Sequence, residues 1–389
     1  MNLKKLIPLY LGAAVGPMGG VGVVTLIPVL AATWSVDFAT ASLAITFYMI
    51  PFVMVQLFSG AVAQLFDARK TLMFGFAVYA LGAVLCGFSP SLWFLMACRA
   101  IQGIGAAFLV PIVMALIGEL VEERDVGKAM GLLGMAYTVG VTLGPLISGL
   151  IEVRFGWAVF FFFLAALAVG AGILYRFSSE PMQGRGGEAP GILSVLPVLK
   201  DAFSRPGVLP LSFAAFCYFI AYIGIMTFTA DFLKSNVGLA SDRIGLLISS
   251  TGFTGIAVSP LAGYLGDRWG RLKVLFGGAA ISLACIVGMN LTAFSYGAYF
   301  FLFLVFGTGS ATAWTSLNTM GVQIQPTFRK PVTSVYNAVK FAGYAFSPLI
   351  LSPLYIPLHL KGVQWGCMVA VVLSFLMAWR GVAVSERAK

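Results

Sequence analysis

The sequence predicts an all-α polytopic membrane protein with twelve transmembrane helices, arranged as two six-helix halves related by pseudo-two-fold symmetry. Three observations predict this fold: a low charge content, a series of long apolar blocks and an internal repeat. Of the 389 residues, 60% are hydrophobic and 10% are charged, whereas soluble domains have about 25% charged residues. A soluble fold of this length would need far more polar surface to cover its core, so the composition indicates a lipid environment.

Long apolar blocks occur twelve times along the chain. A membrane helix needs about 20 mostly apolar residues to cross a hydrocarbon core of about 30 Å. The blocks of this length predict helices at 7–32, 40–64, 71–89, 91–118, 129–151, 157–176, 207–230, 244–265, 274–293, 297–322, 332–355 and 363–380. The first block follows Lys5 and continues to about Ala32, which is too long for the apolar region of a signal peptide, so we interpret it as a transmembrane helix.

The basic residues are distributed unevenly among the connections. If both termini lie in the cytoplasm, 18 of the 24 Lys and Arg residues fall in cytoplasmic segments and four in outer connections. Such an excess orients membrane proteins with the basic loops inside. We therefore predict a multi-pass protein of the cytoplasmic membrane with both termini cytoplasmic. The net charge of +10 then indicates topology and not binding to nucleic acid.

The polar segment 177–206 is rich in Pro and Gly and divides the chain into two bundles. We expect an N-terminal six-helix bundle at 1–176, a cytoplasmic linker at 177–206 and a C-terminal six-helix bundle at 207–389. Glycine motifs recur between the bundles at a nearly constant offset of 203 or 204 residues: Gly103-Ile-Gly105 with Gly307-Thr-Gly309, and Gly140-x3-Gly144-Pro145 with Gly343-x3-Ser347-Pro348. Both halves begin on the same side of the membrane, so the repeat is parallel.

A charged glycine motif lies between the eighth and ninth predicted helices. It has the pattern G-x3-D-R-x-G-R and consists of Gly263, Asp267, Arg268, Gly270 and Arg271. The glycines permit a tight turn and close helix approach, and a carboxylate at a helix end can pair with Arg or face a helix N-terminus. The equivalent segment of the first half, 60–70, has Gln64 in place of the acid.

A second motif, Arg99-x2-Gln102-Gly103, lies within the fourth predicted helix. At 1.5 Å per residue, Arg99 lies about 12 Å from the outer helix end. An arginine at this depth costs several kcal/mol unless it is paired or faces water, and Gln102 shares its helix face. The motif therefore indicates either a functional site or a structural arginine bonded to backbone carbonyls.

A third motif consists of small residues in the fifth predicted helix: Gly131, Gly140, Gly144, Pro145 and Gly149, with Ser148 beside the last glycine. Small residues at this spacing let membrane helices pack closely, and a proline adds a kink. The motif predicts a tight contact with a neighbouring helix.

Polar and aromatic residues that could bind substrate or couple ions recur at helical spacing: Arg99, Gln102, Tyr137, Tyr218, Tyr222, Trp314, Asn318, Tyr336, Asn337, Lys340 and Tyr344. Lys340 lies about 12 Å inside its helix, where a charge is a functional candidate unless its side chain extends to the cytoplasmic surface. We expect no Asp or Glu within the twelve spans. Asp231, at the outer end of the seventh, is the candidate proton site.

These motifs resemble those of the major facilitator superfamily over nearly the whole chain, and most of all those of its twelve-helix drug:proton antiporters. The resemblance implies substrate sites near the bilayer midplane between parallel repeats. It also implies a cytoplasmic conformational latch at Asp267 and a role for Arg99 in proton coupling. The expected activity is secondary active transport of a small solute by alternating access, as proton-coupled efflux of drugs or metabolites. We expect a monomer in the lipid bilayer that uses no cofactor.

Several alternatives remain open at this stage. The two charges within the predicted spans, Arg99 and Lys340, are both positive, whereas exporters of cations often carry a buried acid, so uptake or exchange of a small organic anion is a second hypothesis. An ATP-driven pump would need a GxxxxGKS/T loop, which the sequence lacks. An enzyme would need a nucleophile–base set or a metal cluster, and the single histidine, His359, and five scattered cysteines favour neither. A sensor would need a signalling domain, for which the polar segments are too short.

Overall fold

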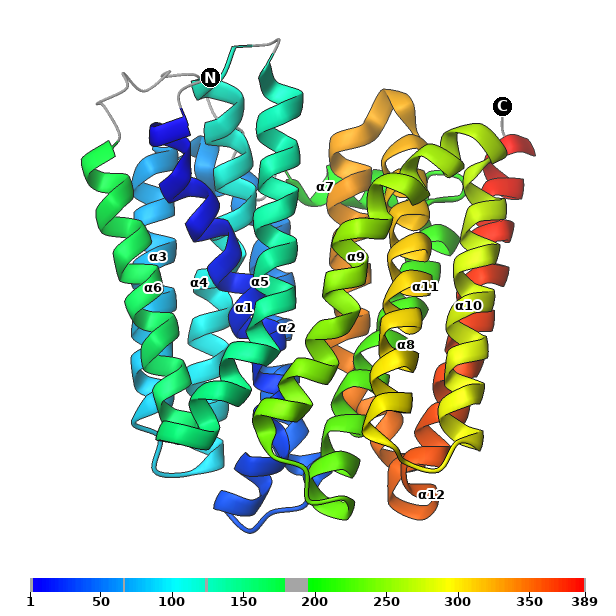
Figure 1. Ribbon diagram of the computed structural model, residues 1–389. Coiled ribbons are helices and arrows are strands. Elements are labelled where there is room, and N and C mark those ends of the chain that lie inside the picture. The colour runs from blue at the N-terminus through cyan, green and yellow to red at the C-terminus, as the bar shows by residue number, and fades with distance from the viewer. Residues whose placement is uncertain (1–2, 66, 123–124, 179–194, 388–389) are drawn as a thin grey trace. The chain divides into compact units, whose positions relative to one another are not determined.

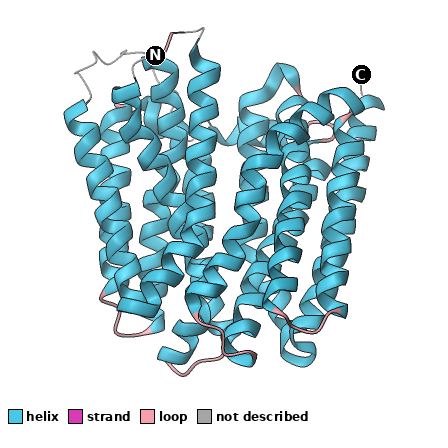
Figure 2. Ribbon diagram, in the orientation of Figure 1, coloured by secondary structure: helices cyan, strands magenta, loops and turns pink. Residues whose placement is uncertain are grey.

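The computed structural model describes residues 3–65, 67–122, 125–178 and 195–387, and Figure 1 shows how its helices are arranged. Within these ranges every regular element is a helix and no strand occurs (Figure 2). The all-α fold class predicted from the composition and the apolar blocks is therefore confirmed.

The chain divides into two compact units. Unit 1 comprises Met1–Val195 and Ala240–Gly245, and unit 2 comprises Leu196–Leu239 and Leu246–Lys389. The helices of unit 1 are α1 (Leu3–Thr33), α2 (Phe38–Leu65), α3 (Ala68–Gly87), α4 (Leu92–Leu120), α5 (Val126–Phe155) and α6 (Trp157–Ser178). The helices α7 (Val195–Ser204), α8 (Val208–Asp231), α9 (Ser241–Trp269), α10 (Arg271–Leu291), α11 (Tyr296–Gln323) and α12 (Arg329–Arg387) make up unit 2, with a π-helix at Phe232–Asn236 and a 3₁₀ turn at Pro326–Phe328. The first residue of α7 and the first five residues of α9 belong to unit 1.

Eleven helices in the described part of the chain are long and apolar enough to cross a membrane. The last of them, α12, holds two of the twelve predicted spans, because its helical backbone is interrupted at His359, where φ is 51° and ψ is −148°. Pro353 and Pro357 precede this break and remove helical N–H donors. The twelve predicted spans therefore correspond to ten single helices and one broken helix.

Local sequence signals determine where several helices begin. The Asp67 carboxylate accepts hydrogen bonds from the backbone N–H groups of Arg69 and Lys70 and caps α3. The Asp37 carboxylate accepts bonds from the hydroxyl and the backbone N–H of Thr40 at the start of α2. These bonds to Thr40, above all the one from its hydroxyl, lower the pKa of Asp37.

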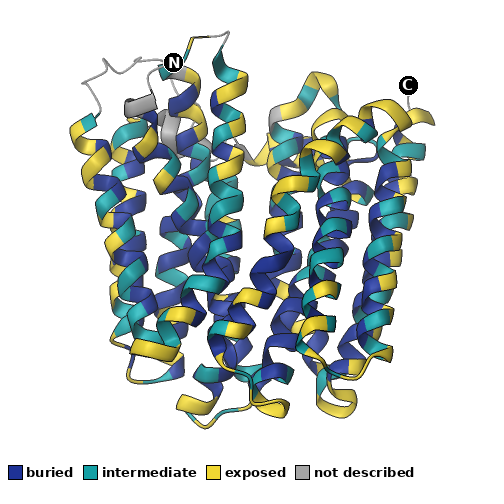
Figure 3. Cartoon of the chain, viewed as in Figure 1, coloured by how far each residue is buried: buried dark blue, intermediate teal, exposed yellow. Residues whose placement is uncertain are grey.

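Large apolar side chains are exposed along many helices, which agrees with a surface that faces lipid. Phe74, Phe276 and Trp379 each expose more than half of their surface. Figure 3 shows buried residues along the helices of each unit, and exposed residues both on helix faces and at the connections.

The segment predicted as a linker, 177–206, contains a helix of its own. Residues 179–194 lie outside the described part of the chain, and α7 follows at Val195–Ser204. In α7, Leu199 and Ala202 are buried, whereas Lys200 is exposed. The second part of the segment is thus an amphipathic helix with a buried face, which its Pro and Gly content did not reveal.

The structure corrects the prediction that the spans contain no acidic residue. The prediction ended the seventh span at residue 230, but α8 includes Asp231 and continues directly into the π-helix, so the span extends over Val208–Asn236. Hydropathy placed the helix end too early because the polar residues after Asp231 lower the average, whereas the backbone remains helical.

Candidate functional site

Arg99 lies at the centre of unit 1 and is completely buried. Its Nη1 donates to the Gly19 carbonyl at 3.0 Å and to Gln102 Oε1 at 2.7 Å, and its Nε donates to the Ala44 carbonyl at 3.3 Å. The guanidinium carbon lies 4.1 Å from the centroid of the Tyr48 ring. Two backbone carbonyls, an amide oxygen and an aromatic face thus surround the charge, and three helices supply them. No described carboxylate forms an ion pair with Arg99.

The helix α1 supplies acceptors to the same cluster. The Tyr48 hydroxyl donates to the Gly16 carbonyl at 2.9 Å, and the Tyr79 hydroxyl donates to the Val15 carbonyl at 3.0 Å. Gly19 is required for this approach, because a Cβ at its position would overlap the Tyr79 hydroxyl. Arg99 Nη2 and Gln102 Nε2 are buried and have no hydrogen-bond partner in the described part of the chain.

The small-residue motif of α5 packs against α1. A Cβ added at Gly140 would lie 3.0 Å from the carbonyl carbon of Ala14, and one at Gly144 would lie 2.7 Å from the Met18 oxygen. The Ser148 hydroxyl donates to the Gly22 carbonyl at 2.7 Å. These contacts place α5 directly on the helix that supports Arg99.

The remaining members of the α5 motif differ in their surroundings. Pro145 and Gly149 are buried in α5, whereas Gly131 has open space where a Cβ would lie. Tyr137 is half-buried on the same helix. Close packing is therefore concentrated in the second half of the motif.

Unit 2 contains a group of rings that we name the aromatic cluster, formed by Tyr218, Phe219, Tyr222, Trp314, Phe341 and Tyr344. The Trp314 ring lies 4.1 Å from Phe219, 5.4 Å from Tyr218 and 6.4 Å from Tyr222, between centroids. Phe219 also lies 5.6 Å from Phe341 and 6.0 Å from Tyr344. The cluster joins α8, α11 and α12. Phe219, Tyr222 and Trp314 are half-buried and give it an accessible side.

Lys340 lies on α12 beside the aromatic cluster and is 9% exposed. Its Nζ donates to Asn318 Oδ1 at 3.3 Å and lies 4.7 Å from the Phe341 ring and 5.5 Å from the Tyr336 ring. The Tyr336 hydroxyl donates to the same Asn318 oxygen at 3.2 Å. The alternative of a side chain extended to the cytoplasmic surface does not fit this buried position. Asn337, the residue after Tyr336, is half-buried.

A pocket of about 350 Å³ adjoins Asn318 within unit 2. Its lining residues are Asn318, Thr319, Val322, Gln323 and Arg329. Asn318 is exposed, so it belongs both to the pocket and to the hydrogen-bonded group around Lys340. Among the described residues of this lining, the charged one is Arg329, which is basic.

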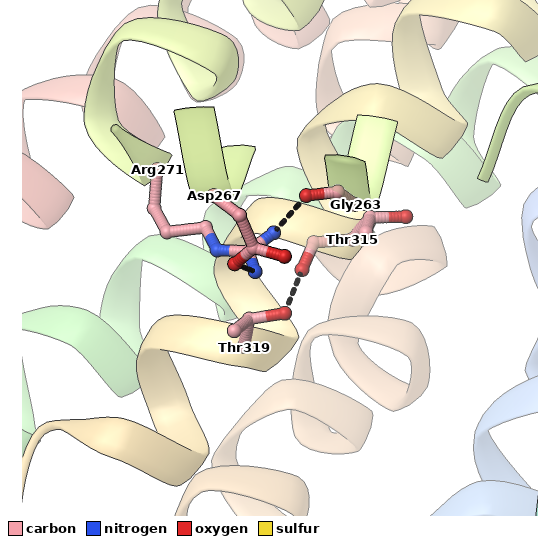
Figure 4. Close-up of polar contacts among 5 residues, drawn as sticks. All are labelled: Gly263, Asp267, Arg271, Thr315 and Thr319. Atoms are coloured by element: carbon pink, nitrogen blue, oxygen red, sulfur yellow. Dashed lines mark hydrogen bonds and ion pairs between the residues drawn. The ribbon is translucent and has the colours of Figure 1, made fainter. Parts of the chain in front are cut away.

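The loop motif between α9 and α10 forms an ion pair across the turn (Figure 4). The Arg271 guanidinium bonds to the Asp267 carboxylate and donates to the Gly263 carbonyl at 2.9 Å. Gly270 has φ of 94° between the two helices, a conformation that other residues rarely adopt. Arg268 points to the Tyr264 hydroxyl. Arg271 thus neutralises a carboxylate at a helix C-terminus, where a negative charge is unfavourable.

Asp231 is 6% exposed at the end of α8. Both carboxylate oxygens accept hydrogen bonds, one from the Tyr355 hydroxyl and one from the Ser235 hydroxyl at 2.9 Å. No ion pair to Asp231 occurs between residues that the structure describes. The acid is therefore held by neutral groups, one of them on α12.

The structure groups most of the predicted site residues into two sets, one in each unit. Arg99 and Gln102 form the first, and the second combines Asn318, Tyr336 and Lys340 with the aromatic cluster. Sequence reasoning missed Tyr48 and Tyr79, which support Arg99, and Phe219 and Phe341, which connect the unit 2 residues. A ring at helical spacing on an apolar helix carries no signal that distinguishes a site residue from a core residue.

Helices of spanning length, with polar and charged residues buried inside them, define a multi-pass membrane protein. Residues 9–348 match the profile of the Major Facilitator Superfamily, and residues 212–387 match it as well. The chain belongs to the Major Facilitator Superfamily. It is accordingly a membrane transporter and not an enzyme.

Curated relatives carry varied names. The chain is 25% identical to the uncharacterized MFS-type transporter YwfA of Bacillus subtilis (strain 168), over 91% of this chain and 86% of the relative. It is 23% identical to the riboflavin transporter RibZ of Clostridioides difficile (strain 630), over 76% of this chain and 75% of RibZ. It is 24% identical to the multidrug resistance protein Stp of Mycobacterium tuberculosis (strain CDC 1551 / Oshkosh), over 71% of this chain and 61% of Stp.

The fold is also similar to solved structures. A bacterial homologue of the human lysosomal transporter Spinster, crystallised in an inward-facing and unoccupied conformation, superposes with a TM-score of 0.81 at 14% identity, over 98% of this chain and 96% of the homologue. The inward-facing and occupied conformation gives a TM-score of 0.77 at 16% identity. At this identity the likeness concerns the fold alone.

Proposed function

We propose that the protein is a secondary active transporter that exports small organic solutes, drugs or metabolites, across the cytoplasmic membrane by alternating access and in exchange for protons. The observation that carries the proposal is the group around Lys340 in unit 2. A buried cation, an exposed amide and partly exposed aromatic rings lie together in this helix bundle. Polar groups inside a membrane are costly and mark substrate or ion pathways.

Two further features support proton coupling and export. The Arg99 motif and the α5 motif both resemble those of the drug:proton antiporters, and Stp is named a multidrug resistance protein. Asp231 is a buried carboxylate without a cationic partner in the described part of the chain. Such a carboxylate can bind and release a proton as its surroundings change, so we assign it as the proton site.

The proposal includes the topology of the chain and the roles of its two bundles and the connecting segment. Both termini lie in the cytoplasm, the bundles 1–176 and 207–389 move as the two halves, segment 177–206 connects them, and the protein works as a monomer. Reporter fusions at Lys389 and Gly186 test the orientation, and both should give a cytoplasmic signal. A periplasmic signal at either position would contradict the proposed topology.

Transport is tested with purified protein in liposomes, with and without an imposed pH gradient. Three fluorescent probes cover the possible charges: ethidium as a cation, naphthalene-2-sulfonate as an anion and riboflavin as a neutral ring compound. We expect flux of at least one probe that depends on the gradient and stops when a protonophore is added. Flux that is the same with and without the pH gradient would reject proton coupling. The absence of flux for all three probes would count against the proposed function.

A further inference from the structure

The ammonium of Lys340 retains hydrogen-bonding capacity. It has three N–H donors, and one of them is used by Asn318 Oδ1. The aromatic faces of Tyr336 and Phe341 stabilise positive charge. No ion pair to a carboxylate is formed by Lys340 in the part of the chain that the structure describes. The positive charge is therefore buried without an anionic partner from the protein.

Asn318 also offers a hydrogen-bond donor, and this donor faces the pocket. Its side-chain oxygen already accepts bonds from Lys340 and Tyr336, so the group that the exposed side chain offers to a ligand is its amide N–H₂. Arg329 lines the same pocket of about 350 Å³, and no acidic residue is among the described residues that line it. The groups that remain for a ligand are thus mostly donors, and two nearby side chains are cationic.

The aromatic cluster provides apolar ring faces, tilted against one another, next to these donors. Phe341 contacts Lys340 on one side and Phe219 on the other, and Phe219 lies against Trp314 at 4.1 Å. Trp314 and Asn318 are one helical turn apart on α11, and neither is buried. A ligand that reaches Asn318 along this face therefore also reaches an indole ring.

We propose that the site at Asn318, where this pocket meets Lys340 and the aromatic cluster, binds an organic anion that carries a flat aromatic or conjugated ring. A carboxylate, sulfonate or phosphate group accepts bonds from Lys340 and Asn318, and the ring lies against Trp314 and Phe219. The inference names the substrate class of the proposed transporter and rests on that function. It does not depend on the direction of transport.

The test measures binding by calorimetry to the purified protein in nanodiscs of neutral phosphatidylcholine. Naphthalene-2-sulfonate, naphthalene-2-sulfonamide and a naphthyltrimethylammonium salt share one ring system and differ in charge. For the wild type we expect the sulfonate to bind about tenfold more tightly than either of the others, as the loss of one charge-assisted interaction implies. A cation that binds as tightly as the sulfonate, or no binding of the sulfonate, would overturn the proposal.

Variants of Lys340 test whether this residue causes the preference for the anion. Lys340→Gln should weaken sulfonate binding about tenfold and leave sulfonamide binding nearly unchanged, whereas Lys340→Arg should retain the preference for the anion. Lys273→Ala removes an exposed cation from α10 and is the matched control. Size-exclusion profiles show whether each variant folds. If Lys340→Gln does not fold, the affinities of Lys340→Arg for the sulfonate and the sulfonamide serve as the test. Equal sulfonate affinity in wild type and Lys340→Gln would refute the assignment.

Two further measurements distinguish a solute site from a lipid site, and an error in the substrate class from an error in the transport function. Dihexanoyl phosphatidylglycerol offers the headgroup charge of a lipid without the ring. Its failure to displace the sulfonate supports a solute site, whereas displacement would make the pocket a lipid site and reject the proposal. The proton-driven flux of ethidium or riboflavin is measured in parallel. If these two probes are transported but the sulfonate does not bind, the substrate class is wrong and the transport function stands.

Discussion

Two buried cations in the described part of this transporter are held in different ways. Arg99 in unit 1 is completely buried and bonds to two backbone carbonyls and to Gln102. Lys340 in unit 2 bonds to one side chain, and that side chain is exposed. The first charge is enclosed by groups of the protein, and its unpartnered Nη2 is buried as well, whereas the second lies beside an exposed side chain. Neither burial nor an unused donor therefore identifies a binding site by itself; a group that a ligand can reach is needed as well.

The residue types suit these two environments. The planar guanidinium presents five N–H donors in a fixed fork, which can address several carbonyls from different helices at once. The lysine ammonium is a compact charge on a flexible stem, and it can turn its donors toward an incoming group. Exchanging the two residue types is therefore the most direct way to challenge the comparison.

Arg99→Lys should have the largest effect. Lysine cannot reproduce the bonds to Gly19, Ala44 and Gln102 together, and each hydrogen bond to a charged group contributes about 1.5–3 kcal/mol. We expect the variant to insert and to purify as a single species, with a clearly lower midpoint of thermal unfolding and the loss of most proton-driven flux of the probe that the wild type transports.

Lys340→Arg is the matched exchange in unit 2 and should lower the unfolding midpoint much less. Flux close to the wild-type level in Arg99→Lys would reject a specific role for the guanidinium. An equal loss of stability in the two variants would remove the distinction between the two cations.

The loop motif gives the second largest effect. Asp267→Asn removes the charge that pairs with Arg271, and we expect flux to fall several-fold. Stability should change by less than about 1 kcal/mol, because exposed ion pairs contribute little and the Asp267 side chain is 73% exposed. Gln64→Ala, at the equivalent position of the first half, is the control and should have little effect. Similar flux in the two variants would mean that the ion pair has no part in the transport cycle.

Asp231→Asn tests the proposed proton site. The amide preserves the size of the side chain but cannot carry a negative charge, so flux should become independent of the pH gradient while the protein remains folded. Tyr355→Phe removes one of the bonds to Asp231 but keeps the acid, and its flux should still respond to the gradient. Persistent gradient dependence in Asp231→Asn would place the proton site elsewhere.

The fold was predictable because membrane helices are encoded locally. Runs of about 20 apolar residues locate them, and the pair Arg99–Gln102 follows from a spacing of three residues on one helix face. The Asp267–Arg271 pair follows from a short motif across one turn. Contacts between helices carry no such local signal. The Asp231–Tyr355 bond joins residues 124 positions apart in the sequence, and the position of Asp231 depends on a π-helix that hydropathy does not reveal.

The smallest effects should come from removing one tyrosine hydroxyl from each cation cluster. Tyr48→Phe deletes the bond to the Gly16 carbonyl, and Tyr336→Phe deletes the bond to Asn318, while each ring stays beside its cation. Tyr48→Phe should lower the free energy of unfolding by about 1 kcal/mol, because its partner is buried inside unit 1. Tyr336→Phe should change stability less, since water can reach the exposed Asn318.

The binding of naphthalene-2-sulfonate should show the opposite order. Tyr336→Phe loosens the hold on Asn318 and should weaken this binding about two- to threefold, within the range expected for one neutral hydrogen bond. Tyr48→Phe lies in the other unit and should leave the affinity unchanged. Thermal unfolding and calorimetry on the same two variants measure both quantities. If each variant changed stability and affinity to the same extent, the contrast between an enclosed and a ligand-accessible cation would be wrong.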